Sequence, residues 1–117
     1  MTSTETAVTA EQVPAVVRQV VRLVAPQPPA QVGNAHQLIG DLGFHSLALA
    51  ELAFTLEDLF GLDAITPERA MTLQTVGDIV TLITEAIGAG QARVPDGDDV
   101  QAFCAQYGAV WDPGTPR

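Results

Sequence analysis

The segment 46–60 constrains the fold more than any other part of the chain, because its apolar residues keep the spacing of one helix face. A period of 3.6 residues places such positions in a single stripe, whereas a strand would scatter them over two faces. The stripe consists of Leu49, Leu52, Ala53, Leu56, Leu59 and Phe60. Gly61 follows at once, and glycine is the usual residue just beyond a helix. We predict an amphipathic helix over 46–60.

A second face of this helix mixes apolar and acidic side chains. Its members are Leu47, Glu51, Phe54 and Asp58, at i, i+4, i+7 and i+11, with Glu57 beside them. One interpretation is an ordinary solvated acidic face with the two apolar residues packed in the core. The other is an exposed recognition surface. The offset of Leu47 and Phe54 from the main stripe favours exposure.

Two further segments have helical periodicity. In 13–24 the repeating residues are valines, which also suit a strand, but Arg18 and Gln19 lie off the valine stripe and favour a helix. In 76–87 the stripe is Val76, Ile79, Val80, Ile83 and Ile87. Thr72 is the expected cap of that helix and Gly88 its end. "ITPERA" (65–70) is typical of a one-turn helix, with Thr66 as cap and Pro67 in the first turn. The expected fold is all-α: a four-helix bundle of three long helices and one short one.

Charge and composition exclude several classes of function. Fourteen acidic residues against five arginines give a net charge of −9. Such a chain repels nucleic acids and anionic membranes, and we expect neither as a partner. No apolar run reaches the length of a membrane span, and the N-terminus lacks a basic and apolar leader. A single cysteine allows neither an internal disulfide nor a cysteine metal cluster, so no metal is expected. We predict a cytoplasmic monomer.

Three interpretations apply to Ser46 within "DLGFHSLALAEL" (41–52). Ser46 could cap the helix through its side-chain oxygen. It could be a nucleophile with His45 as base, although adjacent residues at a helix start point apart and no G-x-S-x-G elbow is present. His36 is the one other histidine. Ser46 could also carry a covalent group, since a helix N-terminus holds an exposed hydroxyl rigidly and stabilises a phosphodiester anion.

The same stretch resembles the prosthetic-group site of acyl and peptidyl carrier proteins. These carry a D-S-L or H-S-L triplet after Leu-Gly at the start of the second helix of a four-helix bundle. "LEDLFGLDAITPERAMTLQTVGDIVTLI" resembles their second helix, short third helix and fourth helix. The resemblance covers roughly residues 10 to 88, and its long first loop corresponds to 26–45 here.

The resemblance implies a carrier and not an enzyme. A phosphopantetheinyl transferase would move phosphopantetheine from coenzyme A onto the Ser46 hydroxyl, and the terminal thiol would hold an acyl or aminoacyl group as a thioester. Loading and condensing enzymes would be the further partners. The positions implied in partner recognition are His45, Leu47, Glu51, Phe54, Glu57 and Asp58.

The motif combines two types of carrier. His45 is familiar in peptidyl carriers, whereas "DLG" followed by Phe44 resembles the acyl type. Acyl and aminoacyl cargo therefore both stay open, and we expect a role in secondary metabolism of polyketide or nonribosomal peptide type. The alternative from another class is an unmodified helical interaction module that binds a basic or apolar partner groove through 46–60.

The expected organisation is a flexible N-terminus (1–8), a carrier domain (9–88), and a linker with a short amphipathic segment (89–117). In that last part Val100, Phe103, Cys104 and Tyr107 keep helical spacing, and Trp111 follows. The segment could pack on the bundle, dock on a partner or remain disordered. Cys104 is expected to be a small core residue and not a reactive thiol.

Overall fold

A computed structural model describes residues 9–29, 31–62, 65, 68–69 and 72–109. Within these ranges the chain is helical and no β-strand is formed. After a 3₁₀ turn, η2 (Ala10–Gln12), come α1 (Val13–Val24), α2 (Ser46–Phe60), α4 (Val76–Gly88) and α5 (Gly97–Gln106). The predicted all-α fold is confirmed. The predicted cap Thr66 and first-turn Pro67 of the short helix lie outside the described residues, and Glu68 and Arg69, which follow them, are helical.

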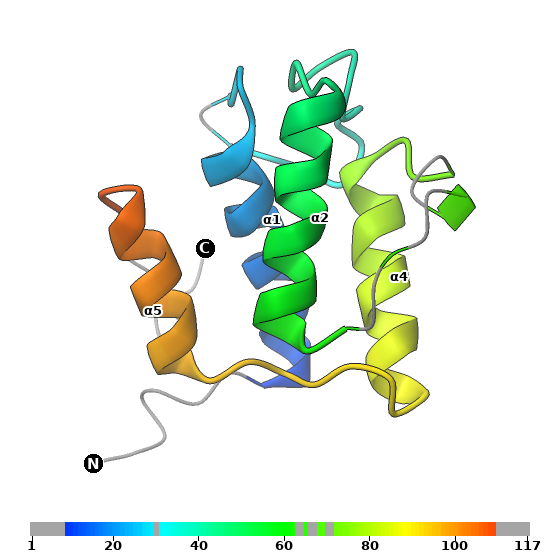
Figure 1. Ribbon diagram of the computed structural model, residues 1–117, viewed down its shortest axis with the longest axis vertical. Helices are drawn as coiled ribbons and strands as arrows, with labels where there is room; N and C mark the ends of the chain where they lie inside the picture. The colour runs from blue at the N-terminus through cyan, green and yellow to red at the C-terminus, as the bar shows by residue number, and fades with distance from the viewer. Residues whose placement is uncertain (1–8, 30, 63–64, 66–67, 70–71, 110–117) are drawn as a thin grey trace.

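Helix α1 is the centre of the bundle and contacts α2, α4 and α5. Figure 1 shows α2 in front of α1, with α4 and α5 on either side. All six valines of α1 are buried. A valine in a helix costs roughly 0.5 kcal/mol relative to alanine. Its full burial contributes about 1.5 kcal/mol or more, so packing outweighs propensity and the segment is a helix, not the rival strand.

Helix α2 buries most of the stripe that its sequence predicts, although Leu49 and Ala53 are only half-buried. Its buried residues are Ala48, Leu52, Leu56, Leu59 and Phe60. The helix ends at Gly61, whose φ of 64° is left-handed. The Leu62 N–H donates to the Glu57 carbonyl at 3.0 Å, which satisfies one of the last carbonyl groups of the helix.

Helix α4 is capped by Thr75, and the expectation that Thr72 caps it was wrong. The Thr75 Oγ1 accepts a hydrogen bond from the Asp78 N–H at 3.2 Å. The Asp78 Oδ2 accepts from the N–H groups of Gln74 and Thr75 at 2.9 and 3.1 Å. The Thr72 hydroxyl instead donates to the Arg69 carbonyl at 2.7 Å. The reciprocal capping box requires an acidic or amide side chain three residues after the threonine, and of the two threonines only Thr75 has one.

The long connection between α1 and α2 is held by the N-terminus of α4. The Val76 N–H donates to the His36 carbonyl at 3.0 Å, and the Gly77 N–H to the Asn34 carbonyl at 2.8 Å. These bonds satisfy first-turn N–H groups that have no partner inside the helix. The connection is therefore an ordered part of the fold despite its lack of helices.

Helix α5 packs on α1, which is the first of the three alternatives for this segment. Val100 and Cys104 are 1% and 0% exposed and belong to the same core as the α1 valines. Burial raises the pKa of the Cys104 thiol, although a contact from Gln19 acts in the opposite direction. Cys104 is accordingly a core residue, as expected. Trp111 lies outside the described residues, and the division of the chain at residue 88 stays a prediction.

The capping box predicts a pH-dependent contribution of Asp78 to stability. Hydrogen bonds from the backbone N–H groups of Gln74 and then Thr75 lower the pKa of Asp78 from its ordinary value of 3.8. A carboxylate with a lowered folded-state pKa adds stability above the ordinary value, and this is lost as the pH falls through the folded-state pKa. Asp78→Asn should lower the free energy of unfolding by about 0.5–1 kcal/mol at neutral pH. Urea titrations should show the deficit shrinking below pH 3.8.

Thr75→Ala is the matched control, because it removes the uncharged half of the same box. It should cost about 1 kcal/mol at neutral and at acidic pH alike. An Asp78→Asn deficit that stays constant with pH would show that the charge of Asp78 contributes nothing.

Candidate functional site

Ser46 is the first residue of α2, and its side chain is exposed. The N-cap position belongs to His45, whose extended backbone has φ −130° and ψ 179° and whose side chain makes no capping hydrogen bond. The interpretation of Ser46 as the helix cap is therefore wrong. Within the described part of the chain, no hydrogen bond engages the Ser46 hydroxyl, so this oxygen is available for chemistry.

A buried anchor immediately before the cap holds Ser46 in place. Phe44 is 2% exposed, and its N–H donates to the Leu38 carbonyl at 3.0 Å. Leu38 and Leu42 are buried in the same core. Gly43 takes a left-handed φ of 73° between the two buried residues Leu42 and Phe44. Phe44 thus anchors the start of α2 in the core. Ser46, two residues later, is held in a fixed position as a result.

Polar contacts complete the turn. The Asp41 Oδ2 accepts a hydrogen bond from the Gln37 N–H at 2.7 Å. The Leu42 carbonyl accepts from the Gln27 N–H at 3.0 Å, which joins the two ends of the long connection. The turn that leads into α2 is consequently held by hydrogen bonds from Gln37 and from Gln27.

The catalytic interpretation of Ser46 finds no support in this geometry. A general base must lie within hydrogen-bond distance of the nucleophile, yet no hydrogen bond joins Ser46 to the neighbouring His45. His36 is engaged elsewhere, since its Nδ1 accepts from the Gly33 N–H at 2.8 Å. Among the residues that the structure describes, no group of three His, Cys, Asp or Glu side chains is placed to hold a metal ion.

The start of α2 suits an attached phosphate. The N–H groups of Ser46, Leu47 and Ala48 donate to no backbone carbonyl in the described ranges, as expected for a first helical turn. Together with the helix dipole, such groups favour a phosphodiester anion at this end of α2. An exposed, unbonded hydroxyl at the same point therefore fits a prosthetic group tethered through a phosphate.

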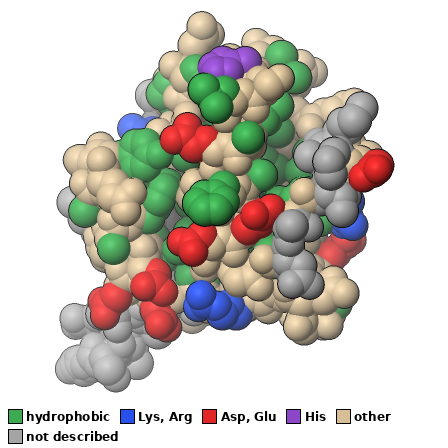
Figure 2. Space-filling view, in the orientation of Figure 1, with side chains coloured by type: hydrophobic (Ala, Val, Ile, Leu, Met, Phe, Trp, Pro, Cys, Tyr) green, Lys and Arg blue, Asp and Glu red, His purple; other side chains and the backbone are tan. Residues whose placement is uncertain are grey.

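The predicted second face of α2 is exposed. Leu47 and Phe54 are 76% and 72% exposed, and Glu51 and Asp58 are also exposed. Figure 2 shows hydrophobic and acidic side chains interspersed on this side of the molecule, with a histidine at the end where α2 begins. The interpretation of Leu47 and Phe54 as core residues was thus wrong.

Glu57 differs from the other acidic residues of α2. It is half-buried, and its Oε2 accepts a hydrogen bond from the Ile65 N–H at 2.7 Å. This bond ties the segment after α2 back to the helix. This hydrogen bond could not be predicted from the sequence, because its partner lies in a loop without periodicity. The exposure of Ile39, an apolar loop residue that is 69% exposed, could not be predicted from the sequence either.

Fold and site together define a helical carrier with an exposed serine at the start of its second long helix. The sequence matches the family model described as "Phosphopantetheine attachment site" over residues 15–83. It is 34% identical over 77 residues to the meromycolate extension acyl carrier protein of Mycobacterium leprae. It is 36% identical over 83 residues to the acyl carrier protein of Rhodococcus erythropolis.

These alignments differ in how much of each protein they include. The first covers 66% of this chain and 66% of the mycobacterial protein, so the chain spans about two thirds of that relative's length. The second covers 69% of this chain and 90% of the Rhodococcus protein. The chain belongs to the phosphopantetheine-attachment family of carrier proteins. Helix α5 lies beyond the matched region.

Membership in this family defines the general role of the protein. It is a non-catalytic carrier of the acyl carrier type, and its prosthetic group is a covalently attached phosphopantetheine. The family implies that carriers of this type interact with a phosphopantetheinyl transferase and with enzymes that handle acyl groups. None of the helices formed by the described residues is both long and apolar enough to cross a membrane.

The turn before the site generates a prediction about Gly43. A Cβ at this position would lie 3.0 Å from the Cγ and Cδ of Gln27, on a backbone with φ of 73°. Gly43→Ala should lower the free energy of unfolding by about 1–2 kcal/mol, measured by urea denaturation. The amide resonances of residues 44–48 should also shift in the NMR spectrum.

Gly90→Ala is the matched control. Its φ of 78° imposes the same backbone strain, but a Cβ there would meet no heavy atom within 4 Å. Gly90→Ala should therefore cost less than Gly43→Ala and leave residues 44–48 unperturbed. Identical losses and identical spectra near Ser46 would show that the Gln27 contact does not shape the site.

Proposed function

We propose that Ser46 is the attachment residue and that the protein carries acyl intermediates as thioesters on a phosphopantetheine arm. The observation that carries the proposal is the exposed Ser46 hydroxyl, unbonded among the described residues, at the first position of α2. It lies inside the region that matches the family. When bound, the group supplies a flexible chain that ends in a thiol, and this thiol holds the cargo.

Attachment requires little of this chain beyond a correctly placed oxygen. The Ser46 oxygen forms a bond to phosphorus, the bond between the two phosphates of coenzyme A breaks, and the adenosine bisphosphate leaves. The serine proton passes to the transferase, because no base of this protein contacts the hydroxyl within the described ranges. Phe44 and the first turn of α2 keep the oxygen in position and stabilise the negative charge of the product.

The exposed face of α2 is proposed as the recognition surface. His45, Leu47, Glu51, Phe54 and Asp58 are all exposed and surround or follow Ser46 on the same helix. Glu57 contributes negative charge, but one of its oxygens is already bonded to Ile65. Apolar anchors beside carboxylates suit partners that present arginine or lysine around an apolar patch.

An acyl cargo is proposed over an aminoacyl one. The relatives named above are acyl carrier proteins, and one of them is named for meromycolate extension. The "DLG" and Phe44 of the motif agree with this choice. A place in polyketide or nonribosomal peptide metabolism rests on the mixed motif alone. The cytoplasmic location and the monomeric state stay predictions.

The attachment is tested by intact-protein mass spectrometry. Incubation of the unmodified protein with coenzyme A and a promiscuous phosphopantetheinyl transferase should add the mass of one phosphopantetheine. Ser46→Ala should add none. The chain contains one other serine, Ser3, so Ser3→Ala is a matched control that should gain mass like the wild type.

Two outcomes would contradict the proposal. Failure of the wild type with several transferases would favour the unmodified interaction module, which uses the same exposed helix face. A gain in mass by Ser46→Ala would move the attachment to another residue.

The recognition surface is tested by charge reversal. A Glu51→Lys/Asp58→Lys double variant should slow modification by the transferase roughly tenfold at low salt, mainly through the association rate. The effect should shrink at high salt because the interaction is screened. Circular dichroism should be unchanged, since both side chains are exposed. Glu85→Lys, an exposed residue of α4, is the control, and an equal loss there would point to net charge rather than to this surface.

A further inference from the structure

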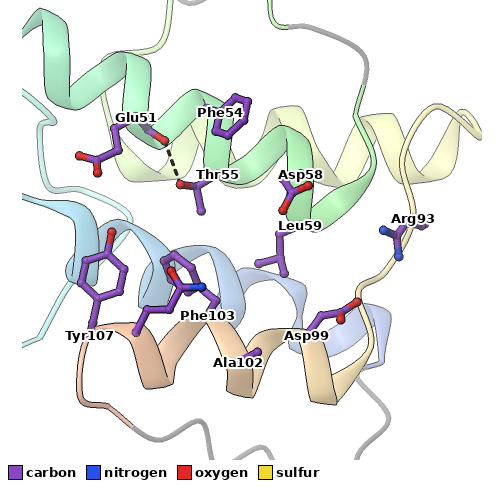
Figure 3. A pocket seen from close by; sticks show the side chains of 11 residues that line it. Glu51, Phe54, Thr55, Asp58, Leu59, Arg93, Asp99, Ala102, Phe103 and Tyr107 are labelled. Carbon is purple, nitrogen blue, oxygen red and sulfur yellow. Dashed lines mark hydrogen bonds between the residues drawn. The ribbon is translucent and has the colours of Figure 1, made fainter.

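A groove of about 540 Å³ separates α2 from α5. Its walls include Glu51, Phe54 and Asp58 of α2 and Asp99, Phe103 and Tyr107 of α5. Figure 3 shows the two helices side by side, with Glu51 and Tyr107 facing each other at one end and Asp99 near Arg93 at the other. We call this the α2–α5 groove. Because α5 lies beyond the family match at 15–83, the family resemblance assigns no role to it.

The groove offers aromatic surface. The rings of Phe103 and Tyr107 lie 5.1 Å apart between centroids at a tilt of 50°. Tyr107 is 41% exposed, and Phe54 on the outer edge of the groove is 72% exposed. Exposed aromatic side chains gathered in a concave surface are typical anchors of protein interfaces.

The rim of the groove is negative. Glu51, Asp58 and Asp99 are exposed, and within the described part of the chain none of them forms an ion pair. Arg93, at one end, is the one basic side chain among the described lining residues, so carboxylates outnumber it three to one. The pKa of Tyr107 is raised by burial and, to a lesser extent, by the charge of Glu51 across the groove. An occupant that brings positive charge would relieve this field.

Most of the α2 wall of the groove faces away from the attachment residue. Ser46 precedes Glu51 by five residues, which at about 100° per residue turns its side chain by roughly 140° around the helix axis. Thr55 and Asp58 of the groove wall lie within about 40° of Glu51 by the same count. A molecule in the groove therefore leaves the Ser46 hydroxyl itself uncovered, although it covers Glu51, Phe54 and Asp58.

The shape suits a helix. From Glu51 to Asp58 the wall runs over seven residues, about 10 Å or two helical turns. Two neighbouring helices with apolar residues between them present the kind of groove that accepts a third helix. A second copy of this chain is disfavoured as occupant, because each copy has a net charge of −9.

We propose that the α2–α5 groove docks an amphipathic helix of a partner protein, with apolar residues at i, i+3, i+4 and i+7 and lysine or arginine on both flanks. Because Glu51, Phe54 and Asp58 also belong to the proposed recognition surface, this partner and the enzymes that serve Ser46 bind the carrier in turn. The proposal goes beyond the thioester-carrying role and shares with it only part of the α2 face.

The test uses the full chain and a labelled synthetic helical peptide of leucine and lysine, with leucines at the stated spacing. Fluorescence anisotropy at physiological salt should show saturable binding. A peptide with glutamate in place of every lysine should bind at least tenfold more weakly. Amide resonances of residues 51–59 and 99–107 should shift on addition of the leucine–lysine peptide. Equal affinity for both peptides would overturn the proposal.

Two matched pairs of variants locate the binding. Asp99→Lys should weaken binding about tenfold, whereas Asp98→Lys, an exposed neighbour in the same first turn of α5 that does not line the groove, should not. Phe54→Ala should weaken it, whereas Leu47→Ala, equally exposed on α2 but outside the groove, should not. Losses of the same size within each pair would overturn the proposal.

Modification separates this proposal from the preceding one. The phosphopantetheinylated protein and the Ser46→Ala variant should bind the leucine–lysine peptide with the same affinity. If the chain is modified at Ser46 but does not bind the peptide, the docking proposal is overturned and the attachment proposal is not. Sedimentation could instead reveal a dimer that the Phe54→Ala substitution dissociates. That result would assign the groove to a second copy of the chain and overturn the docking proposal.

Discussion

Burial of the valine face of α1 is the constraint on which the rest of the structure depends. This helix contacts α2, α4 and α5, so its six buried valines constrain how the other three can lie. Helix α2 must turn its leucine stripe toward α1, and its other face is left in solvent. The exposure of Leu47 and Phe54 is therefore a consequence of packing at the centre of the bundle.

The long connection before α2 converts that packing into a rigid site. Carbonyl groups of Asn34 and His36 accept hydrogen bonds from the first N–H groups of α4. Phe44, the residue before the N-cap of α2, is buried and anchors the chain there. A carrier needs this combination, because its arm is flexible and precision must come from the tether point. Ser46 lies at the junction of the two: its backbone is held by the helix, while its hydroxyl is free of partners in the described ranges.

Most of the helices were predictable, because apolar spacing is a local property of the chain. The stripes over 13–24, 46–60 and 76–87 and the end of α2 at Gly61 were all predicted correctly. The errors lie at helix starts. Thr72 and Thr75 both precede the apolar stripe, but only Thr75 has an acidic residue, Asp78, three positions later to complete a capping box. The interpretation of Ser46 as the cap, one of the three that its local pattern left open, was wrong because Phe44 is buried and His45 takes the cap position.

The sequence by itself determined the helical class, the family motif around Ser46 and the mixed face of α2, since each depends on residues close together in the chain. Only the tertiary structure decided that Glu57 is bonded to Ile65, that α5 packs on α1, and that Glu51 lies across a groove from Tyr107. These contacts join segments without a common periodicity. Their formation depends on how the whole core closes, which no local pattern of residues encodes.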